Sequence, residues 1–292
     1  MSELTEHSAG QILSARDWRA RRVAHEARTA TLIEARRQRA ALGVKEPVED
    51  FLFTYYPFRF SALQRWSPGA GVGLEDAAEL VGGHRFELSA DGLVRVVQPT
   101  DAERHRLNFT LELNQAIALR PAFMGCFGLH EWAMVFNQAA DRRHGDWPLR
   151  LGAEGTDAVV RASAIRCTHY DAFRFFTPGA RPLNRLTPTL EQRVQNEQPG
   201  CVHVTMDLYK WTMKAQPWVS SELAADSFEL ARDARAVDMR ASPYDFSAVG
   251  LEPICIETPE GRSAYESEQR RLTKKAEPVR ARLIAALKGA LV

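Results

Sequence analysis

The chain has 292 residues, of which 45% are hydrophobic and 26% are charged, and its formal net charge at pH 7 is +1. This length can bury a large core, and the composition is that of an ordinary soluble globular protein. No apolar run approaches the roughly 18 residues that a membrane span needs, and the N-terminus is too polar for a signal peptide. The near-zero net charge argues against binding of nucleic acid by overall charge alone. The four cysteines form no short paired motif, so we expect free thiols, a reducing compartment and a cytoplasmic protein.

Positive charge is concentrated near the N-terminus. Between Ser14 and Arg39 three acidic residues stand against eight arginines, namely Arg16, Arg19, Arg21, Arg22, Arg28, Arg36, Arg37 and Arg39. The segment from Ser14 to Gly43 is predicted to be one helix with Trp18 on its inner side. We therefore divide the chain into an N-terminal basic helix, residues 1–45, and a single domain, residues 46–292. The arginines either form a solvated helix face or follow the phosphates of a nucleic acid.

The segment after the basic helix is aromatic and then rich in glycine. Asp50 to Trp66 carries seven aromatic residues, with two arginines among them. Such density is typical of a core, although aromatic rings interleaved with arginine can also stack bases and hold phosphates. The glycines of Ser67 to Leu74 do not match the spacing of a dinucleotide-binding turn. Glu87 to Val97, with Asp91-Gly92 in its middle, is predicted to be a hairpin.

Caps and breakers predict most of the helices. Thr100 and Glu103 form a capping-box pattern, which predicts a helix from about Asp101 to Arg120. Further helices are predicted over Phe123 to Ala140, Thr187 to Gln198, Ser220 or Ser221 to about Met239, and from Thr258 onward with a break or kink at Pro278. A short helix or turn is predicted around Gly155 to Ala162.

The stretch from Ile165 to Phe176 is predicted to be a central strand, because its residues alternate between two faces. His169 and Asp171 would then share one otherwise apolar face, roughly 6.5 Å apart along the strand. An imidazole and a carboxylate buried there must find partners, so they are either a structural pair or parts of a site.

Two further segments complete the predicted architecture. A rigid basic loop with Arg181 and Arg185 would follow the central strand. Cys201 to Trp211 is predicted to be a second buried extended segment, and it contains His203. Together the elements predict an α+β fold, a mainly α-helical single domain with a small β-sheet.

Four motifs resemble a known family. GLHEWAMV, RCTHYDAFRFFTPGARPLN, EQPGCVHVTMDLYKW and DMRASPYD are similar to those of largely actinobacterial proteins carried under the name 3-methyladenine DNA glycosylase. That family also resembles a phage-defence glycosylase that removes glucosylated hydroxymethylcytosine. The resemblance covers most of the chain from Asp50 to Glu260. It implies an enzyme that flips an alkylated purine or a glucosylated 5-hydroxymethylcytosine out of double-stranded DNA and hydrolyses its N-glycosidic bond, in DNA repair or antiviral defence.

Cleavage of an N-glycosidic bond passes through an oxocarbenium-like sugar, which requires a nearby carboxylate and a donor to the departing base. A flipped base must also be stacked on aromatic side chains, and its phosphates must be held by cations. Asp171 is the preferred carboxylate, followed by Glu131 and Asp207, and the candidate donors are His169 and His130. Candidates for stacking are Tyr170, Trp132 and Tyr55, and candidates for DNA contacts are Arg174, Arg181, Arg185 and Lys210.

Two other functions remain open at this level. His130, His169 and His203, with Glu131 or Asp171, could form a zinc or iron site in a metal-dependent enzyme. The chain could also be a helical DNA-binding or scaffold protein without chemistry. We expect a glycosylase that needs no cofactor or metal and contacts no membrane, and the sequence leaves its oligomeric state open.

Overall fold

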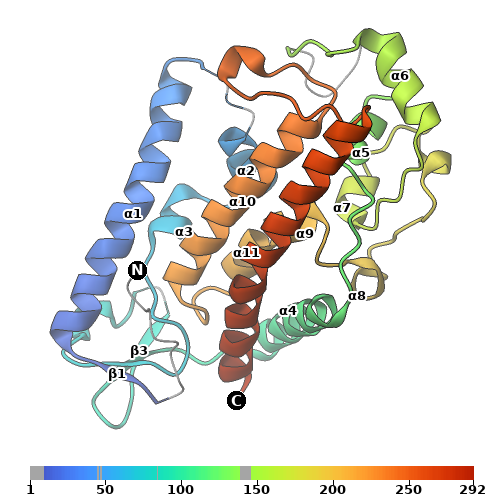
Figure 1. Ribbon diagram of the computed structural model, residues 1–292. Coiled ribbons are helices and arrows are strands. Elements are labelled where there is room, and N and C mark those ends of the chain that lie inside the picture. The colour runs from blue at the N-terminus through green and yellow to red at the C-terminus, as the bar shows by residue number, and fades with distance from the viewer. Residues whose placement is uncertain (1–9, 45, 47, 84, 139–145) are drawn as a thin grey trace.

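The computed structural model describes residues 10–44, 46, 48–83, 85–138 and 146–292 (Figure 1). In these ranges the chain is mainly helical, as predicted. The helices are α1 (Ala15–Ala41), α2 (Glu49–Tyr55), α3 (Phe60–Gln64), α4 (Asp101–Leu119), α5 (Leu129–Ala133), α6 (Gly152–Ala162), α7 (Tyr170–Phe173), α8 (Arg193–Asn196), α9 (Val202–Lys214), α10 (Ser221–Ala241) and α11 (Pro259–Leu291). Three short 3-10 turns are η1 (Ala78–Leu80), η2 (Arg181–Leu183) and η3 (Ser247–Val249).

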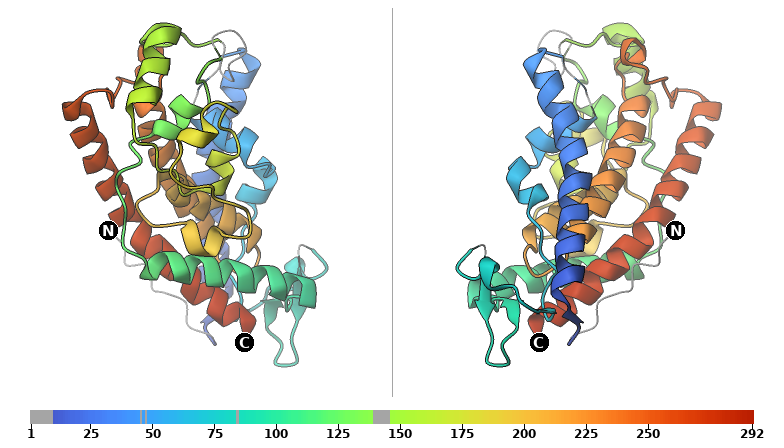
Figure 2. Two further views of the ribbon diagram at one scale, coloured as in Figure 1. Left: turned by 90° about the vertical axis from the view of Figure 1, so that its right-hand side faces the viewer. Right: turned by 90° about the vertical axis from the view of Figure 1, so that its left-hand side faces the viewer.

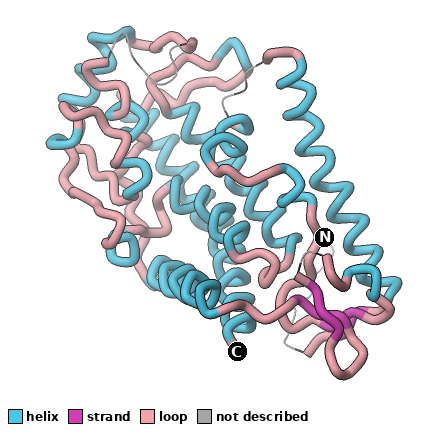
Figure 3. The backbone as a smooth tube through the Cα atoms, turned by 180° about the vertical axis from the view of Figure 1, so that it is seen from behind, coloured by secondary structure: helices cyan, strands magenta, loops and turns pink. Residues whose placement is uncertain are grey.

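A small mixed sheet lies at one end of the helical body (Figure 3). Its strands are β1 (Ile12–Leu13), β2 (Gly73–Leu74), β3 (Phe86–Leu88) and β4 (Val94–Val96), in the order β1-β2-β4-β3. β1 pairs with β2 in parallel, and the other neighbours are antiparallel. β3 and β4 form the predicted hairpin, which extends away from the helices (Figure 2). The α+β fold with a small sheet is therefore confirmed.

Helix α9 forms the centre of the helical body. Every side chain from Val202 to Met213 is buried, which is the condition of a helix surrounded by protein on all sides. α10 and α11 pack against it, and α11 also packs against α4. The prediction of an extended segment over Cys201 to Trp211 is wrong. β-branched residues such as Val202 and Val204 favour strands, but burial on all sides overrides that local preference.

The predicted central strand over Ile165 to Phe176 is also wrong. Ile165 makes one isolated bridge, to Asn184, and the chain then enters the short helix α7. His169 caps this helix, because its Nδ1 accepts a hydrogen bond from the Ala172 N–H at 3.3 Å. A helix turn after a cap sends successive side chains in directions about 100° apart, so His169 and Asp171 do not share a strand face.

The other predicted helices differ mainly in their bounds. Of the helix predicted over Phe123 to Ala140, only α5 forms in the described part, and the last two residues of the predicted range lie outside the described residues. Of the helix predicted over Thr187 to Gln198, only α8 forms. α10 and α11 begin at the predicted caps, Ser220 and Thr258, and α11 continues through Pro278 as one helix. α4 has the predicted capping box, in which the Glu103 carboxylate accepts from the Thr100 N–H at 2.9 Å. None of the described helices has the length and apolarity that a bilayer span requires.

The arginines of α1 bind carboxylates of the helical body. Arg28 contacts Asp226 at 2.7 Å, Arg21 contacts Glu222 at 2.8 Å, and Arg36 contacts Asp50 at 2.8 Å. Trp18 on the inner side of α1 is fully buried. These ion pairs attach α1 to α10 and α2, and they neutralise a large part of its positive charge.

Candidate active site

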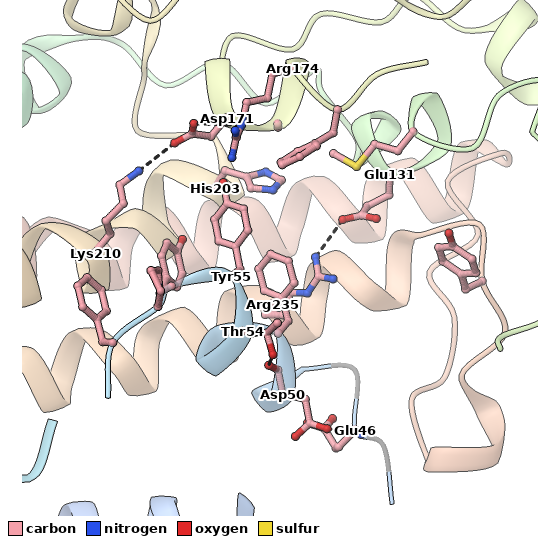
Figure 4. A pocket seen from close by; sticks show the side chains of 18 of the residues that line it. Glu46, Asp50, Thr54, Tyr55, Glu131, Asp171, Arg174, His203, Lys210 and Arg235 are labelled. Carbon is pink, nitrogen blue, oxygen red and sulfur yellow. Dashed lines mark hydrogen bonds and ion pairs between the residues drawn. The ribbon is translucent and has the colours of Figure 1, made fainter. Parts of the chain in front are cut away.

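A cavity of about 780 Å³ opens between α2, α5, α7, α9 and α10 (Figure 4). This volume suits a small organic ligand of nucleoside size. Aromatic side chains form much of its wall, namely Phe51, Tyr55, Tyr56, Phe58, Trp147, Phe175 and Tyr244. Two ion pairs face the cavity, Asp171–Lys210 at one end and Glu131–Arg235 at the other, and His203 lies between them (Figure 4).

One face of α9 supplies the polar groups that connect the two ends. His203, Asp207 and Lys210 follow one another at spacings of four and three residues, so they line up along a single side of the helix. All three are buried, at 5%, 1% and 8% exposure. Asp207 and Lys210 are paired with groups from other elements, as burial of a charge requires. His203 contacts the rings of His130 and His169, and its Nδ1 has no hydrogen-bond partner among the described residues.

Asp171 lies on the cavity wall between two cations. Lys210 Nζ donates to its Oδ2 at 3.1 Å, and Arg193 donates to the same oxygen. Arg174, three residues further along, adds an ion pair at 3.4 Å. Burial alone would raise the pKa of Asp171, but the charges of Lys210 and Arg193 outweigh it and hold that pKa below its usual value. Asp171 is therefore an ionised carboxylate at neutral pH.

Asp207 stands behind Asp171 and organises that end of the site. It accepts from the Tyr56 hydroxyl at 2.7 Å, from His169 Nε2 at 3.2 Å and from Lys210. Because His169 Nδ1 accepts from a backbone N–H, its proton is on Nε2 and points to Asp207. Burial opposes ionisation of Asp207, but Lys210 and His169 lower its pKa well below the usual value.

Glu197 is the least satisfied group near this end. It is fully buried, and neither of its carboxylate oxygens has a hydrogen-bond partner among the described residues. Its Oε1 lies 3.7 Å from His169 Nε2 and 3.5 Å from Arg193 Nε. Burial raises the pKa of Glu197 above its usual value.

The opposite end of the cavity contains a second charge network. Arg235 donates to Glu131 at 2.9 Å and to Asp238 at 2.8 Å, and its guanidinium lies 3.7 Å from the centre of the Phe51 ring. Asp238 also binds His130 Nε2 at 2.8 Å. Burial lowers the pKa of His130, but the attraction of Asp238 more than offsets it and the pKa lies well above its usual value.

His203 separates the two networks and is neutral. Its ring is 4.3 Å from that of His130 and 5.2 Å from that of His169, centre to centre. Burial and the positive charge of His130 lower the pKa of His203 well below its usual value. A neutral imidazole on the cavity wall can hydrogen-bond a ligand without adding charge.

Among the described residues, two groups of side chains have ligand atoms close enough together to hold a metal ion. One contains His130, Glu131, His203 and Asp238, and the other contains His169, Glu197 and Asp207. Protein cations already neutralise both, since Arg235 binds Glu131 and Asp238, and Lys210 binds Asp207. A metal-bound histidine also donates its second N–H to an acceptor. In His169 that second nitrogen accepts a hydrogen bond instead, so the observed bonding fits a protein network better than a metal centre.

The structure brings most of the predicted site residues together. Six line the cavity: Asp171, Glu131, Tyr55, Arg174, Lys210 and His203. His169, His130 and Asp207 lie behind its wall: the two histidine rings contact that of His203, and Asp207 accepts from Lys210. Arg181 and Arg185 are exposed on the loop beyond α7, where Arg181 donates to the Arg174 carbonyl oxygen at 3.2 Å.

Two of the predicted stacking residues do not line the cavity. Trp132 is fully buried in the main core, and its indole N–H donates to the Ala241 carbonyl oxygen at 2.9 Å. A ring without exposed surface cannot stack on a base. Tyr170 faces Arg193, whose guanidinium is 5.8 Å from the centre of the ring. Of the three predicted rings, Tyr55 alone lines the cavity.

Five residues of the site were not among the predicted ones, namely Tyr56, Arg193, Glu197, Arg235 and Asp238. A sequence signal existed for two pairs. Arg193 and Glu197 are four residues apart, and Arg235 and Asp238 are three apart, which are the spacings of neighbours on a helix. These residues belong to the site because they are buried beside it. Their burial depends on helices from distant parts of the chain, which local spacing does not reveal.

Comparisons with known proteins leave the site to be interpreted on its own geometry. The chain matches no protein-family model, and searches of curated proteins and of solved structures find no similar chain.

Proposed function

We propose that this protein is a DNA glycosylase that takes a flipped, modified nucleotide into the cavity and hydrolyses its N-glycosidic bond. The observation that carries the proposal is an ionised carboxylate, Asp171, on the wall of a cavity of nucleoside size lined with aromatic rings. Such a carboxylate is the group that a sugar cation requires. Aromatic walls are what a base removed from its stack requires.

The residues of the cavity then have distinct roles. Asp171 stabilises the positive charge that develops at C1′ as the base departs, and it accepts the proton of the attacking water. Lys210 and Arg193 keep Asp171 ionised and fix its position. Tyr55 stacks on the base, and His203 on the cavity wall hydrogen-bonds the leaving base.

We further infer that the partner is double-stranded DNA and that the cavity opens toward it. Arg174 lines the cavity with a side chain that is 46% exposed, and Arg181 lies next to it. Exposed arginines at a cavity mouth suit the phosphates beside a flipped nucleotide. A cytoplasmic location, in repair or antiviral defence, suits four cysteines that are all free.

One experiment tests the proposal and identifies the base. Duplexes that contain alkylated purines, uracil or glucosylated 5-hydroxymethylcytosine are incubated with the protein, and abasic sites are scored by alkaline strand cleavage. We expect release of one class of modified base by the wild type and none by Asp171→Asn. Failure to release any base from these three substrates, by protein that is shown to be folded, would refute the proposal.

A further inference from the structure

The amine of Lys210 lies beside the carboxylate that is assigned to the sugar. Its Nζ is 3.1 Å from Asp171 Oδ2, and both side chains line the same cavity (Figure 4). A carboxylate that stabilises charge at C1′ must approach that carbon closely, at roughly 3 to 3.5 Å. An amine in hydrogen-bond contact with that carboxylate therefore reaches C1′ as well.

Lys210 is also held firmly in that place. It is 8% exposed and is anchored from below by Asp207, which Tyr56 and His169 fix in turn. Lys214, one turn further along α9, lines the cavity too, but it is exposed. Of these two lysines, Lys210 is the one whose amine is fixed against the reacting carboxylate.

We propose that the protein also cleaves the DNA strand at abasic sites, with Lys210 as the nucleophile that forms a Schiff base at C1′. The inference rests on the proposed function, which places a flipped nucleotide in the cavity with its C1′ beside Asp171. Primary amines add to aldehydes, and the ring-opened sugar of an abasic site is an aldehyde. A carboxylate in contact with the amine supplies the proton transfers that this reaction needs.

The steps balance without any further reactant. The Lys210 ammonium gives a proton to Asp171, and the free amine adds to the C1′ aldehyde. The resulting hydroxyl takes up the proton and leaves as water, which gives an iminium. Asp171 then removes a proton from C2′, and the bond from C3′ to its phosphate breaks with the electron pair going to the phosphate. Water hydrolyses the unsaturated iminium, which restores Lys210 and leaves an unsaturated aldehyde at the new 3′ end.

The test uses DNA in which the abasic site already exists, so that it does not depend on base release. A duplex with one abasic site, made by removing uracil, is mixed with the full-length protein and sodium borohydride, which reduces an iminium to a stable adduct. We expect a covalent protein–DNA complex, and mass spectrometry of its peptides should place the adduct on Lys210. Without borohydride the strand should be cleaved by β-elimination.

A conservative variant separates chemistry from folding. Lys210→Arg keeps a cation between Asp171 and Asp207 but has no amine that can form an iminium. We expect it to lose the adduct and strand cleavage by more than about tenfold. Lys274→Met, which changes an exposed lysine of α11 that does not line the cavity, is the matched control and should behave as the wild type.

Each contrary result has a definite meaning. Absence of an adduct with the wild type, an adduct that maps to Lys214 or to another lysine, or unchanged cleavage by Lys210→Arg would overturn the proposal. Base release without any adduct would refute the lyase activity and leave the glycosylase proposal intact. An adduct on Lys210 without release of any modified base would support the lyase activity and refute the glycosylase proposal.

Discussion

Replacement of Asp171 by asparagine is the most direct perturbation of the proposed chemistry. The change is isosteric and removes one negative charge from the cavity wall. A carboxylate about 4 Å from a full positive charge gains about 4 kcal/mol at an effective dielectric constant of about 20. Lys210 and Arg193 share the same carboxylate and reduce this gain. We therefore expect a loss of about 3 kcal/mol, which corresponds to a more than hundredfold slower release of the base.

The assay should separate the chemical step from binding and folding. Single-turnover base release measures the chemistry, and DNA affinity should stay nearly unchanged because the Asp171 carboxylate contacts no phosphate in the proposed complex. Unfolding by urea should show a loss of about 1 to 2 kcal/mol, since asparagine keeps an acceptor for the two cations. Asp91→Asn is the matched control, because it removes an exposed carboxylate that pairs with Arg95 in the hairpin.

Two results would refute this assignment. If Asp171→Asn retains turnover close to that of the wild type while Glu131→Gln or Asp207→Asn is inactive, a different carboxylate faces the sugar. If the free energy of unfolding of Asp171→Asn falls by as much as the activation free energy of base release rises, then the residue is structural. An inactive Glu131→Gln would move the reaction to the Glu131 end of the cavity, and an inactive Asp207→Asn would keep it at the Asp171 end.

The remaining predictions address the neighbours of the cavity. Arg181→Ala and Arg174→Ala should each weaken DNA binding by about 1 to 2 kcal/mol and reduce the salt dependence by about one counterion, whereas a changed base preference at unchanged salt slope would contradict this placement. Trp132→Ala should destabilise the fold by about 3 to 5 kcal/mol, measured by urea unfolding, and inactivity at full stability would argue for a direct role. Base release should continue in excess chelator, because protein cations already neutralise both buried clusters, and activity that returns only with added zinc or iron would revive the metal hypothesis. Because the pKa of His130 is raised in the folded protein, its pair with Asp238 stabilises the fold fully below pH 6.5, the pKa of an unfolded histidine. This contribution is lost as pH rises through the folded pKa. In urea unfolding from pH 6 upward, the free energy of unfolding of the wild type should therefore decrease with pH, and that of His130→Asn should lack this decrease.

Local signals in the sequence predicted those elements that are held by local interactions. Ser220 and Thr258 cap their helices through hydrogen bonds to residues three positions away, so a short window of sequence contains the whole interaction. The hairpin around Asp91-Gly92 is local in the same sense. Predictions of this kind needed no knowledge of what packs against the element.

The two errors in the centre of the molecule have a common physical cause. Alternation of polar and apolar residues predicts a strand only where one face meets the core and the other meets water. α9 meets protein on every side, so no amphipathic period remains to identify it as a helix. The stretch from Ile165 to Phe176 alternates by coincidence, and the His169 cap decides its conformation instead.

The site was predicted in part for a related reason. Asp171, Glu131 and Lys210 were identified by their chemical type, and all three line the cavity. Their partners could not be assigned, because Arg235 pairs with Glu131 across 104 positions of sequence. A single sequence does not contain such long-range pairings, whereas the charge balance of the cavity depends on them.

The placement of the polar residues on α9 has a consequence for how the molecule opens. Asp207 and Lys210 are paired with groups from the chain around α2 and from α7, so the helix cannot separate from one neighbour without exposing a charge that has lost its partner. Partial opening at α9 is therefore unfavourable compared with complete unfolding. In native-state hydrogen exchange, the amides of α9 should exchange at the rate set by global unfolding, with the same dependence on denaturant as the whole protein. Bound DNA should slow them only as far as it stabilises the entire fold.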